Sequence, residues 1–380
     1  MDQHKNQAGS PPIVYIDSPE LLGDCLASLT SVDRLCVDTE FVRTRTYYPN
    51  LGLVQVSDGQ TNFIIDVPAL DDGEVERLKD CLYNAKELVF YACSEDLEVF
   101  LRVFGSLPPR FYDLQIGLSL LGEEGGQGFA RAVENHLGVT LAKSQTLTDW
   151  LKRPLTQEQL RYAADDVEYL AHLADKLLPT LEAQGKKTWL VEEATLLNER
   201  CLAHSDARHV HLRAKGLDRL NHAQTKRLIA LLEWREIRAQ TRNLPRGFVL
   251  KDPALYELAK RAPSSVDAIA DISGINPERS PGIIEVLNDL LHSDATMNIK
   301  LPDFVPTRSP KDADLKKLKA ELVRLADDAN ISATLITRKK ELERFLYVKD
   351  QPQHPLYPQW LYGWRSTFFS EANAVLASAS

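Results

Sequence analysis

Short apolar runs alternate with segments of helical periodicity through the first half of the chain. A polar turn at residues 57–60 separates two of the runs, as in a β-hairpin. The alternation predicts an α/β domain, and the hairpin-like pair makes its sheet mixed. Strands are predicted at Arg34–Phe41, Leu53–Val56, Phe63–Ile65, Leu88–Tyr91 and Arg110–Asp113. Helices are predicted at Ser94–Phe104, from Asp113 to about Leu121, and at Thr156–Leu178. Thr156 and Gln159 fit a capping box at the start of the last helix.

Beyond about Thr188 the strand signals fade and the pattern is helical. Helices are predicted at Leu217–Gln240, Asp252–Arg261, Ser265–Asp271, Gly282–His292, Asp314–Asn330 and Lys339–Tyr347. Three prolines in Leu301–Pro310 indicate a linker between two helical groups. We therefore expect a flexible N-terminus at 1–12, the α/β domain at 13–190, a linker or helix at 191–213, and helical domains at 214–295 and 296–380.

The composition is that of a globular protein, with 44% hydrophobic and 26% charged residues among 380. The net charge of −9 excludes a uniformly basic coat for nucleic acid. The charge is uneven, because residues 201–250 carry ten basic and four acidic side chains. This segment predicts a local basic surface, although a solvated helix face is the simpler explanation.

The cysteines and the apolar runs indicate the cellular compartment in which the protein is found. Five cysteines, an odd number with no Cys-x-x-Cys spacing, argue against a disulfide framework or a structural zinc site and suit a reducing cytosol. The polar N-terminus has no signal-peptide pattern, and no run of about 20 apolar residues predicts a membrane span. We expect a cytoplasmic protein.

Five chemically capable side chains lie at the edges of the predicted elements. Asp38 and Glu40 share one face of a strand, where their charges repel unless a cation binds. Asp96 follows an apolar run, and Tyr162 and Asp166 lie one helical turn apart. Each pattern alone is commonly a solvated strand end, a helix N-terminus or an exposed pair. Together, oxygen ligands without a His or Cys cluster favour two Mg²⁺ or Mn²⁺ ions, which can cleave a phosphodiester.

The ordered set resembles the DEDD 3′→5′ exonucleases with Tyr-x-x-x-Asp in the third motif, and the longer strings resemble the ribonuclease D family. These strings are VDTEFVRTRTYYPNLGLVQVSDG (Val37–Gly59), CSEDLEVFL (Cys93–Leu101) and LAKSQTLTDWLKRPLTQEQLRYAADDVEYL (Leu141–Leu170). Residues Trp234–Pro263, and Ile331–Leu346 with Gly363–Arg365, resemble helicase-and-RNase-D C-terminal (HRDC) domains. The resemblance implies an α/β RNase H-like exonuclease domain, a mixed sheet flanked by helices, followed by two small all-α HRDC-type domains.

The resemblance also implies roles for the residues at the motif positions. Asp38, Glu40 and Asp166 would hold the metal ion that bears the attacking water. Asp38 would hold the second ion with Asp96, directly or through water. Tyr162 would position that water and help to deprotonate it. The implied activity is a 3′→5′ exoribonuclease that releases 5′-monophosphates from tRNA precursors and other small structured RNAs, and we expect a monomer.

Two details of the third motif indicate the branch of the family and the aspartate that would bind metal. A sister branch of the family would need a His at position 161, where this chain has Arg161. Asp165 lies beside Asp166, but the four-residue spacing from Tyr162 favours Asp166, since Asp165 lies about 100° around a helix.

The substrate contacts leave more alternatives open. Phe41 is either a wedge beside the terminal bases or a core aromatic. The other candidates either bind RNA phosphates or form surface ion pairs and solvated faces; they are Arg43 and Arg45 in the first loop, and Arg235, Arg238 and Arg242 in the basic segment. A DNA 3′→5′ exonuclease of the same fold and a nucleic-acid-binding scaffold with an inactive nuclease core are the alternative functions.

Overall fold

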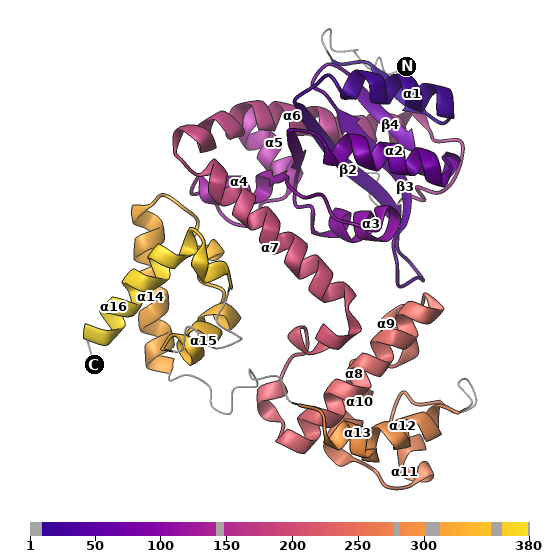
Figure 1. Ribbon diagram of the computed structural model, residues 1–380, viewed down its shortest axis with the longest axis vertical. Helices are drawn as coiled ribbons and strands as arrows, with labels where there is room; N and C mark the ends of the chain where they lie inside the picture. The colour runs from indigo at the N-terminus through magenta and orange to yellow at the C-terminus, as the bar shows by residue number, and fades with distance from the viewer. Residues whose placement is uncertain (1–9, 142–147, 277–281, 301–311, 351–358, 379–380) are drawn as a thin grey trace.

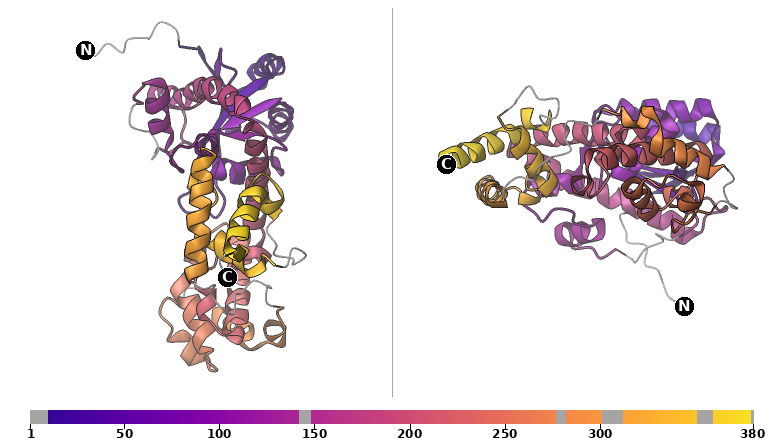
Figure 2. Two further views of the ribbon diagram at one scale, coloured as in Figure 1. Left: turned by 90° about the vertical axis from the view of Figure 1, so that its left-hand side faces the viewer. Right: turned by 90° about the horizontal axis from the view of Figure 1, so that it is seen from below.

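The computed structural model describes residues 10–141, 148–276, 282–300, 312–350 and 359–378 of the chain. Figure 1 shows an α/β domain from which the long helix α7 (Lys187–Ser205) leads to a group of helices at the opposite end of the molecule. The C-terminal helices lie beside α7, between these two parts, in the views of Figure 2 as well. The predicted linker Leu301–Pro310, most of the predicted flexible N-terminus, and Lys143 and Ser144 of the third string lie outside the described residues.

A six-stranded mixed sheet forms the centre of the α/β domain, as predicted. The strand order is β1-β4-β3-β2-β5-β6. Strands β2, β3 and β4 pair antiparallel, while β1 with β4, β2 with β5, and β5 with β6 pair parallel. The strands are β1 (Ile13–Ile16), β2 (Arg34–Val42), β3 (Asn50–Ser57), β4 (Asn62–Asp66), β5 (Glu87–Phe90) and β6 (Tyr112–Asp113).

Helices cover both faces of this sheet because the strand side chains alternate between two apolar clusters. Val37 packs with Leu22, Leu78 and Phe100 of the helices on one face. Cys36, its neighbour, packs in the cluster that holds the helices of the other face. The first face carries α1 (Pro19–Leu29), α2 (Asp72–Tyr83) and α3 (Ser94–Phe104), and the second carries α4 (Leu114–Leu120), α5 (Phe129–Leu137) and α6 (Gln157–Ala183).

The first helical domain has an apolar core of its own. Helix α8 contributes Leu228 and Leu231, which pack against Leu255 and Leu258 of α10 and Leu287 of α12. Its helices are α8 (His222–Arg242), α9 (Arg246–Val249), α10 (Asp252–Arg261), α11 (Val266–Ala270), α12 (Ile283–His292) and α13 (Asp294–Met297).

The C-terminal helices instead share a core with the α/β domain. Apolar residues of α14 (Asp312–Asp328), α15 (Lys339–Val348) and α16 (Arg365–Ser378) belong to the same buried cluster as those of α4 and α6. The Lys186 ammonium donates to the carbonyls of Leu120 (2.9 Å) and Asn330 (3.0 Å), which joins the two parts. Trp189 of α7 stacks on Trp364, with ring centroids 4.9 Å apart.

Candidate active site

Strand β2 brings two of the predicted acids to the face of the sheet that α6 covers. Asp38 and Glu40 lie two residues apart on β2 and therefore point to one face. The antiparallel register sets Asp38 opposite Gln55, and Glu40 opposite Leu53, on β3. Leu53 packs in a small buried cluster with Tyr162 of α6, so this face of β2 and β3 meets the helix.

Helix α6 lies close to the sheet because its contact surface is made of small side chains. Ala163 and Ala164 are fully buried in the same cluster. The predicted capping box starts the helix. The backbone N–H of Gln159 donates to the Thr156 hydroxyl (3.2 Å), and the backbone N–H of Thr156 donates to Gln159 Oε1 (2.8 Å). The start of the helix is thereby fixed, and with it the side chains of its first turns.

Three carboxylates from β2 and α6 converge. One oxygen each of Asp38, Glu40 and Asp166 can be chosen so that all three atoms lie within 4.8 Å of one another. The Tyr162 hydroxyl lies close enough to Asp166 that the charge of this carboxylate raises the pKa of the hydroxyl. All four side chains are half-buried at the junction of strand and helix.

Asp165 lies outside this group. Arg161 Nε donates to Asp165 Oδ1 (2.7 Å), and Arg161 Nη2 also donates to the buried Glu168 (2.6 Å). The two neighbouring aspartates therefore have different partners: Asp166 belongs to the acidic cluster, and Asp165 forms an ion pair with Arg161, which also pairs with the buried Glu168.

Asp96 joins the acidic group from the other side of β2. It lies in the first turn of α3 and is buried, and its carboxylate accepts a hydrogen bond from the Thr39 hydroxyl. Its negative charge raises the pKa of Asp38 and of Glu40. The structure thus brings three of the predicted acids together beside Tyr162, and it places Asp96 near enough for its charge to act on two of them.

Burial and mutual repulsion make these carboxyl groups hard to ionise in the absence of a cation. Burial is the largest cause and raises the pKa of Glu40 to about 9, of Asp166 to about 7 and of Asp96 to about 6. The pKa of Asp38 rises well above its usual value, first through burial and then through the charges of Asp96 and Asp166. A bound divalent cation would favour the ionised forms, so the electrostatics of the cluster suit a metal site.

The candidates near the first loop have different surroundings. Phe41 is half-buried and packs against the apolar cluster of the α1–α3 face. Arg43 is engaged, because its guanidinium donates to Glu98 (2.7 Å) and to the Tyr47 carbonyl (3.0 Å). Arg45 is exposed and forms no ion pair with any residue that the structure describes. Of this group, Arg45 is the cation most open to a ligand.

The three arginines of α8 are not equivalent. Arg235 is buried, and its Nη1 donates to the Leu250 carbonyl (2.9 Å) and to Asp252 (2.5 Å). Arg238 lies over the Trp234 ring, 5.6 Å from the centroid, and Arg242 is exposed. The structure therefore separates Arg235 from the exposed positions of this helix.

Gln55 is a feature of the site that the sequence did not indicate. It lies directly across the sheet from Asp38 and is fully buried. Neither its amide nitrogen nor its amide oxygen has a hydrogen-bond partner among the described residues. The available signal was one glutamine inside the apolar run Leu53–Val56, but periodicity does not reveal which buried side chain faces an acid.

The sheet and its acidic cluster define a class, the 3′→5′ exonucleases. Residues 13–182 match the 3′-5′ exonuclease family, and residues 224–279 match the HRDC domain. The HRDC-type character of the second helical region, at 296–380, stays a prediction.

Comparisons over the whole length identify the family within this class. The chain is 34% identical to the ribonuclease D of Shewanella sp. (strain ANA-3), covering 95% of this chain and 93% of the relative. It is 35% identical to that of Escherichia coli (strain K12), covering 92% and 95%. The crystal structure of E. coli RNase D, described as an exoribonuclease involved in structured RNA processing, superposes with a TM-score of 0.81 at 31% identity, covering 96% of this chain and 98% of that one.

The chain belongs to the ribonuclease D family. It is a hydrolytic 3′→5′ exoribonuclease whose fold and acidic cluster call for divalent metal ions. Within the described ranges, no helix combines the length and the apolar character needed to span a membrane.

Proposed function

We propose that the enzyme removes one nucleotide at a time from RNA 3′ ends with two Mg²⁺ or Mn²⁺ ions and releases 5′-monophosphates. The observation that carries this proposal is the convergence of Asp38, Glu40 and Asp166, with Asp96 adjoining from α3.

The donor set fits hard divalent cations. The cluster consists of carboxylates, and the described residues add no His or Cys to it. We assign Asp38, Glu40 and Asp166 to one ion, and Asp38 with Asp96 to the other. When bound, the ions supply charge stabilisation at the phosphate and lower the pKa of water. Without them, the acidic cluster offers an RNA phosphate no positive charge.

Tyr162 is suited to orienting the attacking water. Burial and the charges of Asp166 and Glu40 raise the pKa of its hydroxyl, which therefore keeps its proton at neutral pH. A hydroxyl that holds its proton can fix the position of a water through a hydrogen bond. Its predicted share in deprotonating the water has less support, because a protonated phenol is a poor base.

The proposed substrates are RNAs with a free 3′ end, including tRNA precursors and other small structured RNAs. The basic segment at residues 201–250 supports a nucleic-acid partner, since phosphate contacts supply most of the sequence-independent affinity. We further propose that the enzyme acts as a monomer in the cytoplasm.

The test uses a 5′-labelled single-stranded RNA with a short 3′ tail, and a DNA of the same sequence in a parallel lane. The full-length protein is incubated with Mg²⁺, with Mn²⁺ or with EDTA, beside the Asp38→Ala variant. We expect a one-nucleotide ladder from the RNA 3′ end that requires both metal and Asp38.

The outcomes separate the alternatives. A ladder on the DNA but not on the RNA would assign the enzyme to DNA. Absence of a ladder with either metal, while the RNA is still retarded in a gel, would leave only a binding scaffold. A ladder that persists in Asp38→Ala would remove Asp38 from the site.

A further inference from the structure

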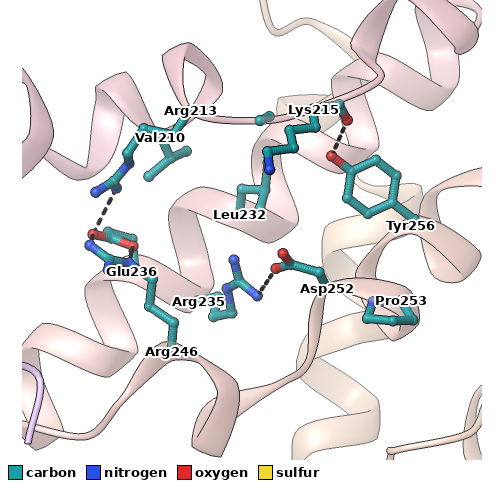
Figure 3. A pocket seen from close by; sticks show the side chains of 11 residues that line it. Val210, Arg213, Lys215, Leu232, Arg235, Glu236, Arg246, Asp252, Pro253 and Tyr256 are labelled. Carbon is teal, nitrogen blue, oxygen red and sulfur yellow. Dashed lines mark hydrogen bonds and ion pairs between the residues drawn. The ribbon is translucent and has the colours of Figure 1, made fainter. Parts of the chain in front are cut away.

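A pocket of about 480 Å³ lies in the first helical domain, away from the acidic cluster. One wall is the segment that follows α7, and the others are α8 and the start of α10 (Figure 3). Four basic side chains line it against two acidic ones, Glu236 and Asp252; the basic ones are Arg213, Lys215, Arg235 and Arg246. The lining thus has an excess of positive charge.

Two of the four cations are already paired, and they share one carboxylate. The Glu236 carboxylate is almost fully buried and accepts from Arg213 (2.9 Å) and from Arg246 (2.6 and 2.7 Å). Tyr47, from the loop after β2, donates to the same carboxylate (2.5 Å). This group closes one side of the pocket, and its two guanidiniums against one carboxylate leave one net positive charge there.

Arg235 is the buried group that remains incompletely paired. Its side chain is only 8% exposed, and its Nη1 serves both Leu250 and Asp252. Its buried Nε has no partner among the described residues. Figure 3 shows another guanidinium nitrogen of Arg235 facing the open space of the pocket. A buried guanidinium with unused donors is costly unless an acceptor reaches it.

Lys215 completes the arrangement from the opposite wall. Figure 3 shows its ammonium pointing into the pocket, and it forms no ion pair with a described residue. The Tyr256 hydroxyl donates to the Lys215 carbonyl and so holds the backbone of this segment in place. Leu232 and Pro253 supply an apolar wall beside the two cations.

We propose that this pocket binds a phosphate group of the RNA strand, upstream of the nucleotide being removed, between Arg235 and Lys215. The unused donors of Arg235 and the net positive charge of the lining favour an oxyanion as the ligand. The apolar wall can contact the sugar that is attached to the phosphate. The contact between Tyr47 and Glu236 ties the pocket to the loop after β2, so an RNA held in both places has a fixed position. This inference rests on the proposed function, since it assumes an RNA substrate.

The test is Lys215→Glu in the full-length enzyme, because Lys215 is exposed and its ammonium pairs with no residue in the described part of the chain. Lys260→Glu is the matched control, an exposed lysine at the end of α10 that does not line the pocket. Binding of a labelled RNA of about 20 nucleotides is measured in EDTA over a range of salt concentrations. We expect Lys215→Glu to weaken binding at least about fivefold more than Lys260→Glu, and to lower the salt slope by about 0.7 per lost phosphate contact.

A second substrate separates this proposal from the proposed function. Both variants and the unmodified enzyme are given a trinucleotide, which reaches the active site but has few upstream phosphates. Equal trimming of the trinucleotide by all three, with the loss of long-RNA binding confined to Lys215→Glu, supports the pocket. Equal binding of long RNA by the two variants overturns it. Failure of the unmodified enzyme to trim either RNA refutes the proposed function itself.

A released 5′-mononucleotide offers the same phosphate chemistry. Its binding to the unmodified enzyme and to Lys215→Glu is therefore measured as well. If the mononucleotide binds as tightly as the long RNA and loses affinity in Lys215→Glu, the pocket holds product, and the assignment to the RNA strand is wrong.

Discussion

At the scale of single residues, Glu40 shows what crowding does to a carboxyl group. Its pKa reaches about 9 because burial removes water and because Asp166 and Asp96 add negative charge nearby. At neutral pH, the folded enzyme without metal therefore holds protons that the unfolded chain has already released.

We expect the free energy of unfolding in EDTA to fall as the pH rises from about 5 to 9. The folded-state pKa values of Glu40 (about 9) and Asp166 (about 7) exceed their ordinary values, so this stability is present below the ordinary values and is lost as the pH rises through the raised ones. Glu236 does not interfere, because its pKa is lowered to about 2 and its effect lies at more acidic pH.

Urea unfolding at pH 5, 7 and 9 checks this prediction. Mg²⁺ should stabilise the enzyme more at pH 9 than at pH 5, and Glu40→Gln should flatten the pH dependence in EDTA. Stability that rises between pH 5 and 9 without metal would contradict it.

Gln55→Leu is expected to stabilise the fold and to weaken the enzyme. Its buried amide has no hydrogen-bond partner among the described residues, so an apolar side chain of similar size should raise the free energy of unfolding by about 1 kcal/mol in EDTA. Loss of a polar group across from Asp38 should lower activity. Asn62→Leu is the control, because Asn62 donates to Glu168 (3.2 Å) and its loss should destabilise. A destabilised Gln55→Leu would mean that the amide is satisfied.

At the scale of elements, the site depends on how closely neighbouring segments approach. Ala163 and Ala164 let α6 lie on the sheet, and Gly52 of β3 lets the segment before α6 do the same. A Cβ on Gly52 would lie 2.5 Å from the carbonyl oxygen of Trp150, a buried residue. The hydrophobic pattern predicts the helix and the strands, but it is silent on this spacing.

Gly52→Ala is therefore expected to destabilise the enzyme by about 1–3 kcal/mol, because backbone must move to accept one methyl group. Gly23→Ala is the contrasting variant: Gly23 lies within α1 and its nearest neighbour, Arg77, is 3.9 Å from the added Cβ. It should be neutral or stabilising by up to about 1 kcal/mol. Chemical denaturation compares the two, and equal effects would mean that the contact with Trp150 yields freely.

At the scale of the whole molecule, we expect the C-terminal helices and the exonuclease domain to unfold together, because their apolar side chains form one common core. The link includes a fully buried ion pair, in which Arg365 Nη2 donates to Glu193 of α7 (2.9 Å). Trp364 Nε1 donates to the same glutamate (2.8 Å). The first helical domain has a separate core, so it can unfold independently of the other two parts.

Arg365→Met should lower the thermal transition that Mg²⁺ raises, because it leaves the Glu193 charge buried at a cost of about 3 kcal/mol. Arg324→Met on α14 is the control, since its ion pairs with Glu321 and Asp328 are exposed and worth little. Calorimetry with and without Mg²⁺ reports the result. If Arg365→Met shifts only a transition that Mg²⁺ does not affect, the C-terminal helices unfold separately.

The sequence alone determined the order of most elements and the chemical identity of the acidic set. Strand and helix periods are local properties, so β2, α3, α6 and α10 could be predicted within a few residues. The spacing of Tyr162 and Asp166 predicted which aspartate faces the site, because four residues make one helical turn. The short strand β1 and the helices α1, α2, α5, α9, α13 and α16 were not predicted, and the region of α7 was left open as a linker or a helix.

Only the tertiary structure decided which groups meet across the chain. The burial of Arg235, the orphaned amide of Gln55, the pairing of Arg43 with Glu98, and the merging of the C-terminal helices with the exonuclease core join residues that are distant in sequence. Composition and periodicity record how a segment distributes its apolar side chains. They do not record which other segment covers them, and that partner sets the burial, the hydrogen bonds and the charge of each group.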